Sequence, residues 1–444
     1  MLEGSGGLWT DGDPPPRSGN ELELVVDGAD ALPRIAAELE RAESSVWIAG
    51  WYLSTELALV RARGRVVLLD LLEELARRIE VRVLLWAGAP LPLFRPSRGD
   101  LRDLRDRLAR VGVRCALDAR ERPLHCHHEK LVIVDERVAF AGGIDLTSYA
   151  GDRFDSSEHS YRSALGWHDA TARVQGPTVA DLADHFRVRW REVTGEELPA
   201  GGQPEAAGEH ELQVVRTVPE RVYDAMPRGE FRILEAYVRA LRAAERLVYL
   251  ESQFLWSPEL VSILADKLAH PPSDDFRLVV LLPAHPQSGG DATLGQLGVL
   301  VDADGEAGRF LACTLYARDG AESCPIYVHA KIGIVDDRWL TIGSANLNEH
   351  SLFNDTELNL VSCEPQVARE TRQRLWAEHL ELPLDQVSGD PVELIEERWK
   401  PIAAEQYQRR RRGEPLTHRV MHLPGTSRRS RRLLGPLQSL VVDG

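Results

Sequence analysis

The stretch HHEKLVIVDERVAFAGGIDL (residues 127–146) occurs a second time in this 444-residue chain, as VHAKIGIVDDRWLTIGSANL (328–347). The two stretches align without a gap at a constant offset of 201 residues. Each copy has a histidine, a lysine, an aspartate, an arginine and a glycine at the same positions. Self-similarity at a fixed long offset is the sign of a repeated structural unit.

Two further pairs of segments keep the same order and nearly the same offset. RAESSVWIAGWYLS (41–54) matches AAERLVYLESQFLW (243–256) at an offset of 202, and VRVLLWAGAP (81–90) resembles FRLVVLLPAHP (276–286). Because order and spacing are both kept, we interpret the chain as two copies of one domain.

Each copy has the pattern of strands that alternate with helices. The apolar spacing predicts a helix, a strand and a second helix before the repeated stretch, at 32–43, 45–51 and 68–79 in the first copy and at 231–245, 247–252 and 293–301 in the second. The repeated histidine and lysine open a further strand. This alternation predicts an α/β layer structure.

Composition shifts along the chain predict the domain boundaries. We expect a disordered N-terminus, a first domain, a linker rich in Gly, Pro, Glu and Ala, a second domain and a basic tail, at 1–20, 21–200, 201–212, 213–400 and 401–444.

The charge is unevenly distributed. The net charge of −16 divides into +8 from Arg398 to the end and −24 over residues 1–397. An acidic body argues against a protein that coats nucleic acid. The basic tail can contact anionic membrane lipids peripherally, although a solvated, disordered tail is the plainer interpretation.

The remaining bulk features favour a cytoplasmic protein. Five scattered cysteines fit neither a disulfide framework nor a zinc site. The first residues lack the pattern of a signal peptide, and no run of apolar residues is long enough to span a bilayer. We expect a monomer that contains an internal pseudo-dimer, and that meets any lipid from the membrane surface.

Each copy carries the pattern H-x-K-x4-D. The residues are His128, Lys130 and Asp135, then His329, Lys331 and Asp336. Side chains two apart in a strand share one face, so each histidine projects with its lysine. Only four of the 53 basic residues are lysines, and two of these four fall in the pattern. Two core histidines beside snorkelling lysines would not explain why both copies keep the motif in register.

Two imidazoles and two ammonium groups around one point suit the displacement of a phosphodiester. One neutral histidine can attack phosphorus and form a covalent intermediate. The other, protonated, can give its proton to the leaving alkoxide. The lysines would stabilise charge on the phosphate oxygens. This scheme needs no metal or other cofactor, and no cluster of His, Cys or Asp at metal-ligand spacing is evident.

The paired motifs resemble the HKD signature of the phospholipase D superfamily, over about residues 20–380. That resemblance implies two similar α/β/α sandwich domains, packed as a pseudo-twofold pair with one active site between them. It also implies that His128 is the nucleophile and His329 the acid and base, while the near-symmetry of the copies leaves the reverse assignment open.

The segments GSAN (343–346), NDTELN (354–359), WHD (167–169) and YLESQF (249–254) also resemble the superfamily. The resemblance implies that Asn346 contacts phosphate, that Glu357 orients the second-motif histidine, and that Asp169 supports the first. Asp145 occupies the position of Asn346 in the first copy, where it either holds Lys130 or points elsewhere. The expected substrate-binding and supporting residues are Asn346, Ser344, Gly143, Asp145, Asp169, Glu357, Glu251 and Gln253.

The resemblance favours a lipid enzyme that hydrolyses phospholipids or exchanges their head groups. One alternative is a phosphatidyltransferase like cardiolipin synthase, a family that usually carries membrane helices. Another is a nuclease of the same superfamily, which the acidic body disfavours. A non-enzymatic lipid-binding scaffold would predict a broken motif, and both motifs are intact.

Overall fold

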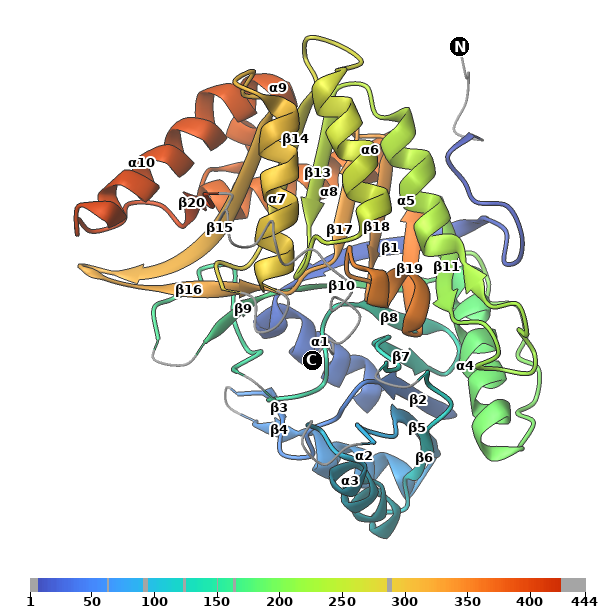
Figure 1. Cartoon of the computed structure of the whole chain (residues 1–444). Coiled ribbons are helices and arrows are strands. Elements are labelled where there is room, and N and C mark those ends of the chain that lie inside the picture. Colours follow the sequence, from blue (N-terminus) through green and yellow to red (C-terminus); the bar gives the residue numbers. More distant parts are fainter. Residues whose placement is uncertain are drawn as a thin grey trace.

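The computed structural model describes residues 7–61, 64–90, 95–122, 125–149, 151–162, 165–285 and 290–424. Figure 1 shows two α/β halves stacked on one another, with the N-terminal half in blue and green below and the C-terminal half in yellow to red above.

A seven-stranded sheet forms the centre of the N-terminal half. Its strands lie side by side in the order β1 (Arg17–Val26), β10 (Ala170–Gln175), β8 (Val138–Gly142), β7 (Leu131–Val134), β2 (Ser45–Gly50), β5 (Glu80–Trp86) and β6 (Arg114–Asp118). Neighbours run antiparallel from β1 to β2, and β2, β5 and β6 run parallel.

The C-terminal half repeats this sheet strand for strand. The equivalent order is β11 (His210–Val218), β19 (Glu357–Ser362), β18 (Trp339–Gly343), β17 (Ile332–Val335), β13 (Leu247–Glu251), β14 (Arg277–Leu281) and β15 (Phe310–Asp319). The directions of neighbouring strands are also the same. The predicted duplication and α/β class are therefore confirmed.

The two sheets are joined through their equivalent edge strands. β1 pairs antiparallel with β11, with Arg17 opposite Leu212 and Asn20 opposite His210. A second connection lies near the other end of the interface, where β9 (Gly166–His168) pairs with β16 (Glu322–Val328). Because equivalent edges meet in opposite directions, the halves are related as a pseudo-twofold pair.

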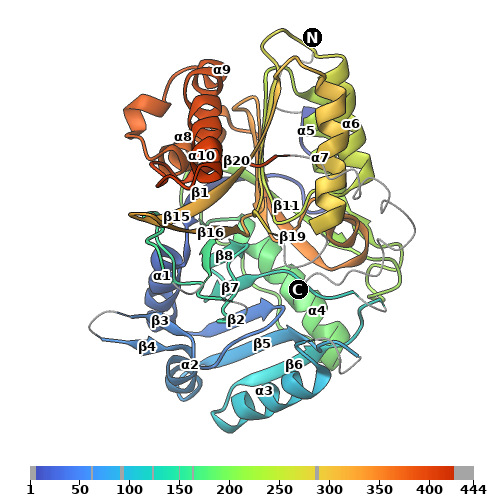
Figure 2. The same cartoon turned by 60° about the vertical axis from the view of Figure 1, so that its left-hand side comes forward.

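Helices cover the outer face of each sheet. The outer helices of the first half are α1 (Gly28–Glu40), α2 (Leu68–Ala76) and α3 (Arg98–Arg110), and those of the second are α5 (Arg232–Ala243), α6 (Pro258–Ala269) and α7 (Gly290–Asp304) (Figures 1 and 2). Alternate residues of each buried strand face different cores. In β2, Val46 and Ile48 pack in the outer core, while Trp47 and Ala49 face the inner one.

The inner core is shared by both halves and contains the long helices α4 (Thr178–Thr194) and α8 (Pro365–Leu380). Phe186 and Trp190 of α4 lie in the same apolar cluster as Leu375 and Trp376 of α8. Burial of this apolar surface is worth roughly 25 cal/mol per Å², so it favours a fixed relationship between the halves.

The remaining elements are short or lie at the C-terminal end. They are β3 (Ala58–Val60), β4 (Val66–Val67), β12 (Glu230–Phe231), a π-helical turn at His350–Asn354, a 3-10 turn at Leu384–Val387, α9 (Pro391–Leu394), a π-helical turn at Ile395–Trp399, α10 (Lys400–Arg411) and β20 (Val420–His422). Of the helices in the described residues, none has the length and apolar character needed to cross a membrane.

The expectation of a disordered N-terminus is wrong for residues 7–20. Leu8 and Trp9 pack against the outer core of the C-terminal half, and the Trp9 carbonyl accepts a hydrogen bond from Arg239. The Thr10 amide and hydroxyl both donate to Gln213 Oε1, at 3.1 and 3.0 Å. The segment is ordered because its apolar side chains are buried and its polar groups have partners on the other half.

Two other boundaries also differ from expectation. β11 begins at His210, inside the expected linker. The expected tail begins within α10, and β20 then pairs with β15, so residues 401–424 belong to the folded body. The rest of the predicted tail, residues 425–444, lies outside the described residues.

Candidate active site

The two motif histidines face one another across the interface between the halves. His128 lies three residues before β7, and His329 lies three residues before the equivalent strand β17. Their ring centroids are 6.5 Å apart, and the ring planes make an angle of 70°. Both residues are buried, with 5 % and 4 % of their surface exposed. The duplication therefore brings its two motifs together at one place.

Each histidine is held by a carboxylate from the opposite half. His128 Nδ1 lies 3.0 Å from Glu357 Oε1, and His329 Nδ1 lies 2.7 Å from Asp169 Oδ2. The resemblance implied that Asp169 supports the first histidine and Glu357 the second, and both pairings are wrong. The carboxylate bound to Nδ1 fixes the orientation of each ring.

Main-chain hydrogen bonds explain why each histidine meets the carboxylate of the opposite half. The His128 amide donates to the Thr356 carbonyl at 2.9 Å, and the His329 amide donates to the His168 carbonyl at 2.8 Å. Each acceptor directly precedes the carboxylate that binds the histidine. The start of each motif therefore lies against the other half.

Burial changes the acidity of both carboxylates. It raises the pKa of Glu357 to about 8, although the charge of Lys130 and hydrogen bonds from Ser344 and Ser351 oppose the rise. It raises the pKa of Asp169 to about 6, against the charges of nearby cations. A carboxyl that is reluctant to ionise suits a position beside an imidazole that must gain and lose a proton.

The motif lysines lie beside their histidines and are buried. Lys130 Nζ donates to the His128 carbonyl at 2.6 Å and lies 3.3 Å from Asp145 Oδ2, as one of the two sequence alternatives proposed. Lys331 Nζ donates to the His329 carbonyl. Burial, followed by the charge of Lys130, lowers the pKa of Lys331 to about 7.

The surrounding cations also act on His329. Burial is the largest cause of a lowered pKa of His329, and the charges of Lys331 and Arg153 add to it. The pKa of His329 therefore falls well below its usual value. An imidazole in this environment is neutral until an anion enters. The arrangement therefore favours the binding of an anion such as a phosphate diester.

Two predicted phosphate-pocket residues form a chain of amide groups. Asn346 Nδ2 donates to Gln253 Oε1 at 3.4 Å, and Gln253 Nε2 donates to the Tyr327 hydroxyl at 2.9 Å. Asn346 Oδ1 is buried, and within the described residues no hydrogen bond reaches it. Such an unsatisfied amide is available to a bound ligand.

Glu251 lies behind the site rather than in it. Its carboxylate accepts hydrogen bonds from Tyr249, His168 and His379 at 2.6, 2.9 and 3.0 Å. None of these partners is a motif residue, so of the two expected roles, substrate binding and support, these contacts fit support. His168 is the residue before Asp169, so Glu251 supports the loop that carries it.

The motif aspartates are also outside the site, so their assignment as catalytic residues is wrong. Asp135 accepts hydrogen bonds from the amides of residues 43–45, and Asp336 accepts them from those of residues 245–247. Both lie past the far end of their strands, where they hold the start of the neighbouring strand β2 or β13. Each histidine lies before its strand and each aspartate after it, so the four residues of the strand separate the two.

Gly143 and Ser344 occupy equivalent positions in the two halves but make different contacts with the supporting carboxylates. A Cβ atom on Gly143 would lie 2.2 Å from Asp169 Oδ1, so only glycine leaves room for that carboxylate. At the equivalent place the Ser344 hydroxyl donates to Glu357. The two halves are therefore not interchangeable around their carboxylates.

Arg153 and Trp167 are neighbours of the site that sequence analysis did not identify. The Arg153 guanidinium lies 3.3 Å from the centre of the Trp167 ring, and that ring lies 4.9 Å from the His329 ring. Arg153 Nε and Nη1 are buried, and no hydrogen bond to them is found in the described residues. Trp167 precedes His168 and Asp169 in a segment that was recognised, whereas Arg153 stands in no recognisable spacing.

Three clusters could hold a metal ion, contrary to the expectation from spacing. Among the described residues, ligand atoms lie within 4.8 Å of one another in the groups Asp27, His159, His168 and Glu378; His168, Glu251 and His379; and His125, His350 and Asp355. None includes His128 or His329. Sequence spacing missed them because the ligands of each come from distant stretches.

The sequence comparisons agree with the arrangement of these motifs. The family model described as phospholipase D matches residues 315–423. The chain is 25 % identical to phospholipase D A of Dictyostelium discoideum, over 85 % of this chain and 37 % of that protein. It is 26 % identical to phospholipase D2 of Bos taurus, over 78 % of this chain and 49 % of that protein. The chain thus spans less than half the length of these two relatives.

Among solved structures, the fold is similar to that of phosphatidylserine synthase from Haemophilus influenzae Rd KW20. The TM-score is 0.54 at 14 % identity, over 85 % of this chain and 92 % of that one. At this identity the likeness concerns the fold alone. The family match and the relatives, together with the duplicated HKD motifs, support the phospholipase D superfamily for this chain.

Proposed function

We propose that this protein is a phosphodiesterase that cleaves phospholipids at the head-group side, or exchanges the head group for another alcohol, through a phosphohistidine intermediate. The observation that carries the proposal is the 6.5 Å separation of the His128 and His329 rings, each backed by a carboxylate of the other half. Attack needs reacting atoms about 3–3.5 Å apart, and proton transfer needs a donor within about 2.6–3.2 Å of the leaving oxygen. A single phosphate between the rings can meet both requirements.

In the first step, Nε2 of His128 attacks phosphorus while the bond from phosphorus to the head-group oxygen breaks. His329 Nε2 gives a proton to that oxygen, so the head group leaves as an alcohol and not as an alkoxide. The product is a phosphatidyl group bonded to His128. One difficult displacement becomes two easier ones.

In the second step, His329 takes a proton from water or from an acceptor alcohol, whose oxygen attacks phosphorus. The phosphorus–nitrogen bond breaks, and His128 is released. Water yields phosphatidic acid, whereas an alcohol yields a new phospholipid. His329 therefore acts first as acid and then as base.

The cations around the site would adjust the protonation of His329 to the reaction. Burial and the charges of Lys331 and Arg153 keep its pKa low. A bound phosphate diester supplies a negative charge, which favours the imidazolium form. The proton needed by the leaving group is thus acquired together with the substrate.

We propose that no metal takes part in these bond-making steps, because the two imidazoles and the enclosed lysines supply the nucleophile, the acid and the positive charge. Dialysed enzyme should hydrolyse a soluble short-chain phospholipid at the same initial rate with and without added Ca²⁺ or Mg²⁺. A strict requirement for either ion would contradict this part of the proposal.

The lipid substrate is supported by the relatives, which bear the name phospholipase D. The charge of −24 on residues 1–397 disfavours a nucleic acid substrate. The discriminating assay offers phosphatidylcholine vesicles with ethanol, and single-stranded DNA in parallel. Formation of phosphatidylethanol supports the proposal, whereas DNA cleavage without lipid turnover contradicts it.

Variants locate the chemistry. His128→Asn and His329→Asn should each abolish turnover, while His125→Asn, three residues from the first motif histidine, should retain it. Quenching wild type at alkaline pH and mapping the peptides should find the phosphatidyl group on His128. Finding it on His329 would reverse the two roles, and full activity of either motif variant would remove that histidine from the mechanism.

A further inference from the structure

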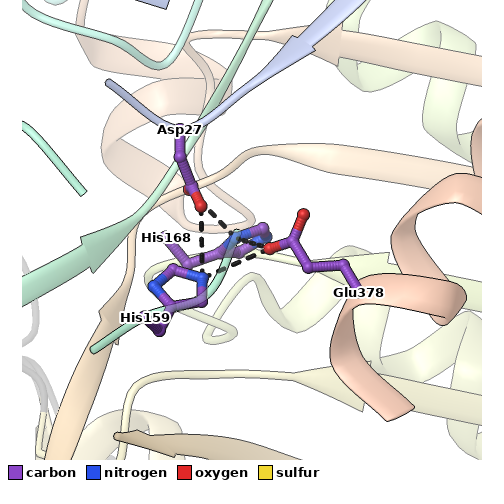
Figure 3. Close-up of side chains that lie close together, drawn as sticks. All are labelled: Asp27, His159, His168 and Glu378. Carbon is purple, nitrogen blue, oxygen red and sulfur yellow. Dashed lines mark hydrogen bonds and ion pairs between the residues drawn. The ribbon is translucent and has the colours of Figure 1, made fainter. Parts of the chain in front are cut away.

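A second cluster of histidines and carboxylates lies behind the histidine pair. Figure 3 shows the side chains of Asp27, His159, His168 and Glu378 pointing toward one another. They come from four separate parts of the fold: Asp27 lies between β1 and α1, His159 in the loop before β9, His168 in β9, and Glu378 in α8. Asp27, His159 and His168 belong to the first half, and Glu378 belongs to the second.

The separations between ligand atoms are those of a small metal site. His159 Nε2 lies 3.2 Å from Asp27 Oδ2 and 3.2 Å from Glu378 Oε1. His168 Nδ1 lies 3.2 Å from Asp27 Oδ1 and 3.3 Å from Glu378 Oε1. Zinc bonds of about 2.0–2.1 Å in a tetrahedron place ligand atoms about 3.3–3.4 Å apart.

Hydrogen bonds do not account for the whole arrangement. Within the described part of the chain, Asp27 Oδ2 and His168 Nδ1 are buried and have no hydrogen bond of acceptable angle, although each lies close to an oppositely polar atom. Asp27 and His168 are completely enclosed, and His159 is 2 % exposed. Buried polar atoms that face one another without a hydrogen bond call for a shared partner.

The other ring nitrogen of each histidine lies against a further carboxylate. His168 Nε2 is 2.9 Å from Glu251 Oε2, and His159 Nδ1 is 3.3 Å from Asp155 Oδ2. Histidines that bind metals almost always have such a partner, which fixes the ring and makes the ligand nitrogen more basic. Both histidines are thus oriented as metal ligands are.

We propose that Asp27, His159, His168 and Glu378 bind one zinc ion, which is structural and lies apart from the phosphate site. Two imidazoles and two carboxylates form a closed tetrahedral set that leaves no position for a substrate. A cleft of about 690 Å³, lined in part by Glu378, Ala29 and Ser156, reaches the cluster from the surface and gives the ion a path of entry.

The charges of the cluster favour a cation. Four carboxylates lie within 3.3 Å of a ring nitrogen of His159 or His168, namely those of Asp27, Glu378, Asp155 and Glu251. A divalent ion bound by the two imidazoles would supply positive charge among these carboxylates.

The ion would fasten the active site to both halves. The Asp27 amide donates to the Asp169 carbonyl at 2.7 Å, and the Asp169 amide donates to Asp27 Oδ1 at 3.0 Å. Asp169 in turn holds His329. Zinc bound to Asp27 and His168 would therefore fix the carboxylate that orients this histidine, while Glu378 ties the same point to α8.

The test is the metal content of the full-length protein, and it does not depend on any enzyme assay. Protein incubated with zinc and then freed of unbound ion should hold one zinc per chain by elemental analysis. His159→Asn and Glu378→Gln should lose it, while His270→Asn, an exposed histidine far from the cluster, should keep it. Zinc should also raise the melting temperature of wild type and of His270→Asn. It should not raise that of His159→Asn or Glu378→Gln.

Cobalt(II) keeps the proposal testable if the variants fail to fold. Wild type should take up cobalt and acquire the strong visible absorption of a tetrahedral ion. A wild type that binds neither ion would show that the cluster holds protons only, and would overturn the proposal. Retention of zinc in both folded cluster variants would place the ion elsewhere, with the same consequence. Phospholipid turnover can succeed or fail without changing either result.

Discussion

Asp169 Oδ2 and His329 Nδ1 lie 2.7 Å apart, although the two residues belong to different halves of the duplicated chain. Glu357 and His128 form the reciprocal pair at 3.0 Å. Because each histidine takes its orientation from the other half, neither half can form a complete site alone. The pseudo-twofold interface is thus part of the site.

Replacing either supporting carboxylate should impair catalysis without unfolding the protein. Asp169→Asn and Glu357→Gln keep the size of the side chain but replace the carboxylate by a neutral amide, whose NH2 group can turn toward Nδ1 and favour the wrong tautomer. Each variant should therefore lower kcat on the order of 10²–10⁴-fold. The measurement is steady-state turnover of phosphatidylcholine, with circular dichroism as the control for folding. Wild-type kcat in a folded variant would show that the carboxylate does not position its histidine.

The motif aspartates should behave in the opposite way. Asp135→Ala removes the acceptor of the amides of residues 43–45, and should lower the free energy of unfolding by about 1–3 kcal/mol. Since Asp135 lies outside the site, kcat should stay near the wild-type value. Urea unfolding and turnover on the same sample decide between the two roles. A large loss of kcat at unchanged stability would return Asp135 to the catalytic groups.

Burial of Glu357 predicts a dependence of stability on pH. Its pKa is raised from 4.5 to about 8, so the native state favours the protonated carboxyl. Between these values the unfolded state binds fewer protons, and the contribution of this group to stability falls as pH rises. Glu357→Gln cannot ionise, so the free energy of unfolding of wild type relative to this variant should decrease from pH 5 to pH 8. An advantage of wild type that grows with pH would contradict this.

Gly143 should tolerate no side chain. In Gly143→Ala the new Cβ would lie 2.2 Å from Asp169 Oδ1, and would push this carboxylate away from His329. We expect kcat to fall by up to about 10²-fold, which is the cost when a positioned group shifts by about 1 Å. Gly99→Ala is the matched control, because its Cβ would meet only the Ser97 hydroxyl at 3.5 Å. Equal activity of the two variants would show that the contact is relieved at no catalytic cost.

The sequence predicted what depends on local pattern and on the repeat. The offsets of 201 and 202 residues identified β17 as the equivalent of β7 and β13 as the equivalent of β2, and the spacing of His128 and Lys130 marked the site. These features follow from periodicity within a single segment.

What the sequence could not predict depends on how the halves pack. Alternation along a strand gives the face on which Glu357 lies, but not which histidine it meets across the interface. In the same way, the distance from the motif histidine to Asp135 was evident, but the role of Asp135 follows from its contact with the start of β2. Asp27 and Glu378 are 351 residues apart, so no spacing rule could bring them together.

The most direct test of the central claim is the stereochemistry at phosphorus. A phospholipid made chiral at phosphorus with oxygen isotopes would be converted by the enzyme with an alcohol acceptor, and the configuration of the product determined. Two successive in-line displacements, by His128 and then by the alcohol, predict retention of configuration. Inversion would mean that the alcohol attacks the substrate directly, and would contradict a phosphohistidine intermediate held between the two halves.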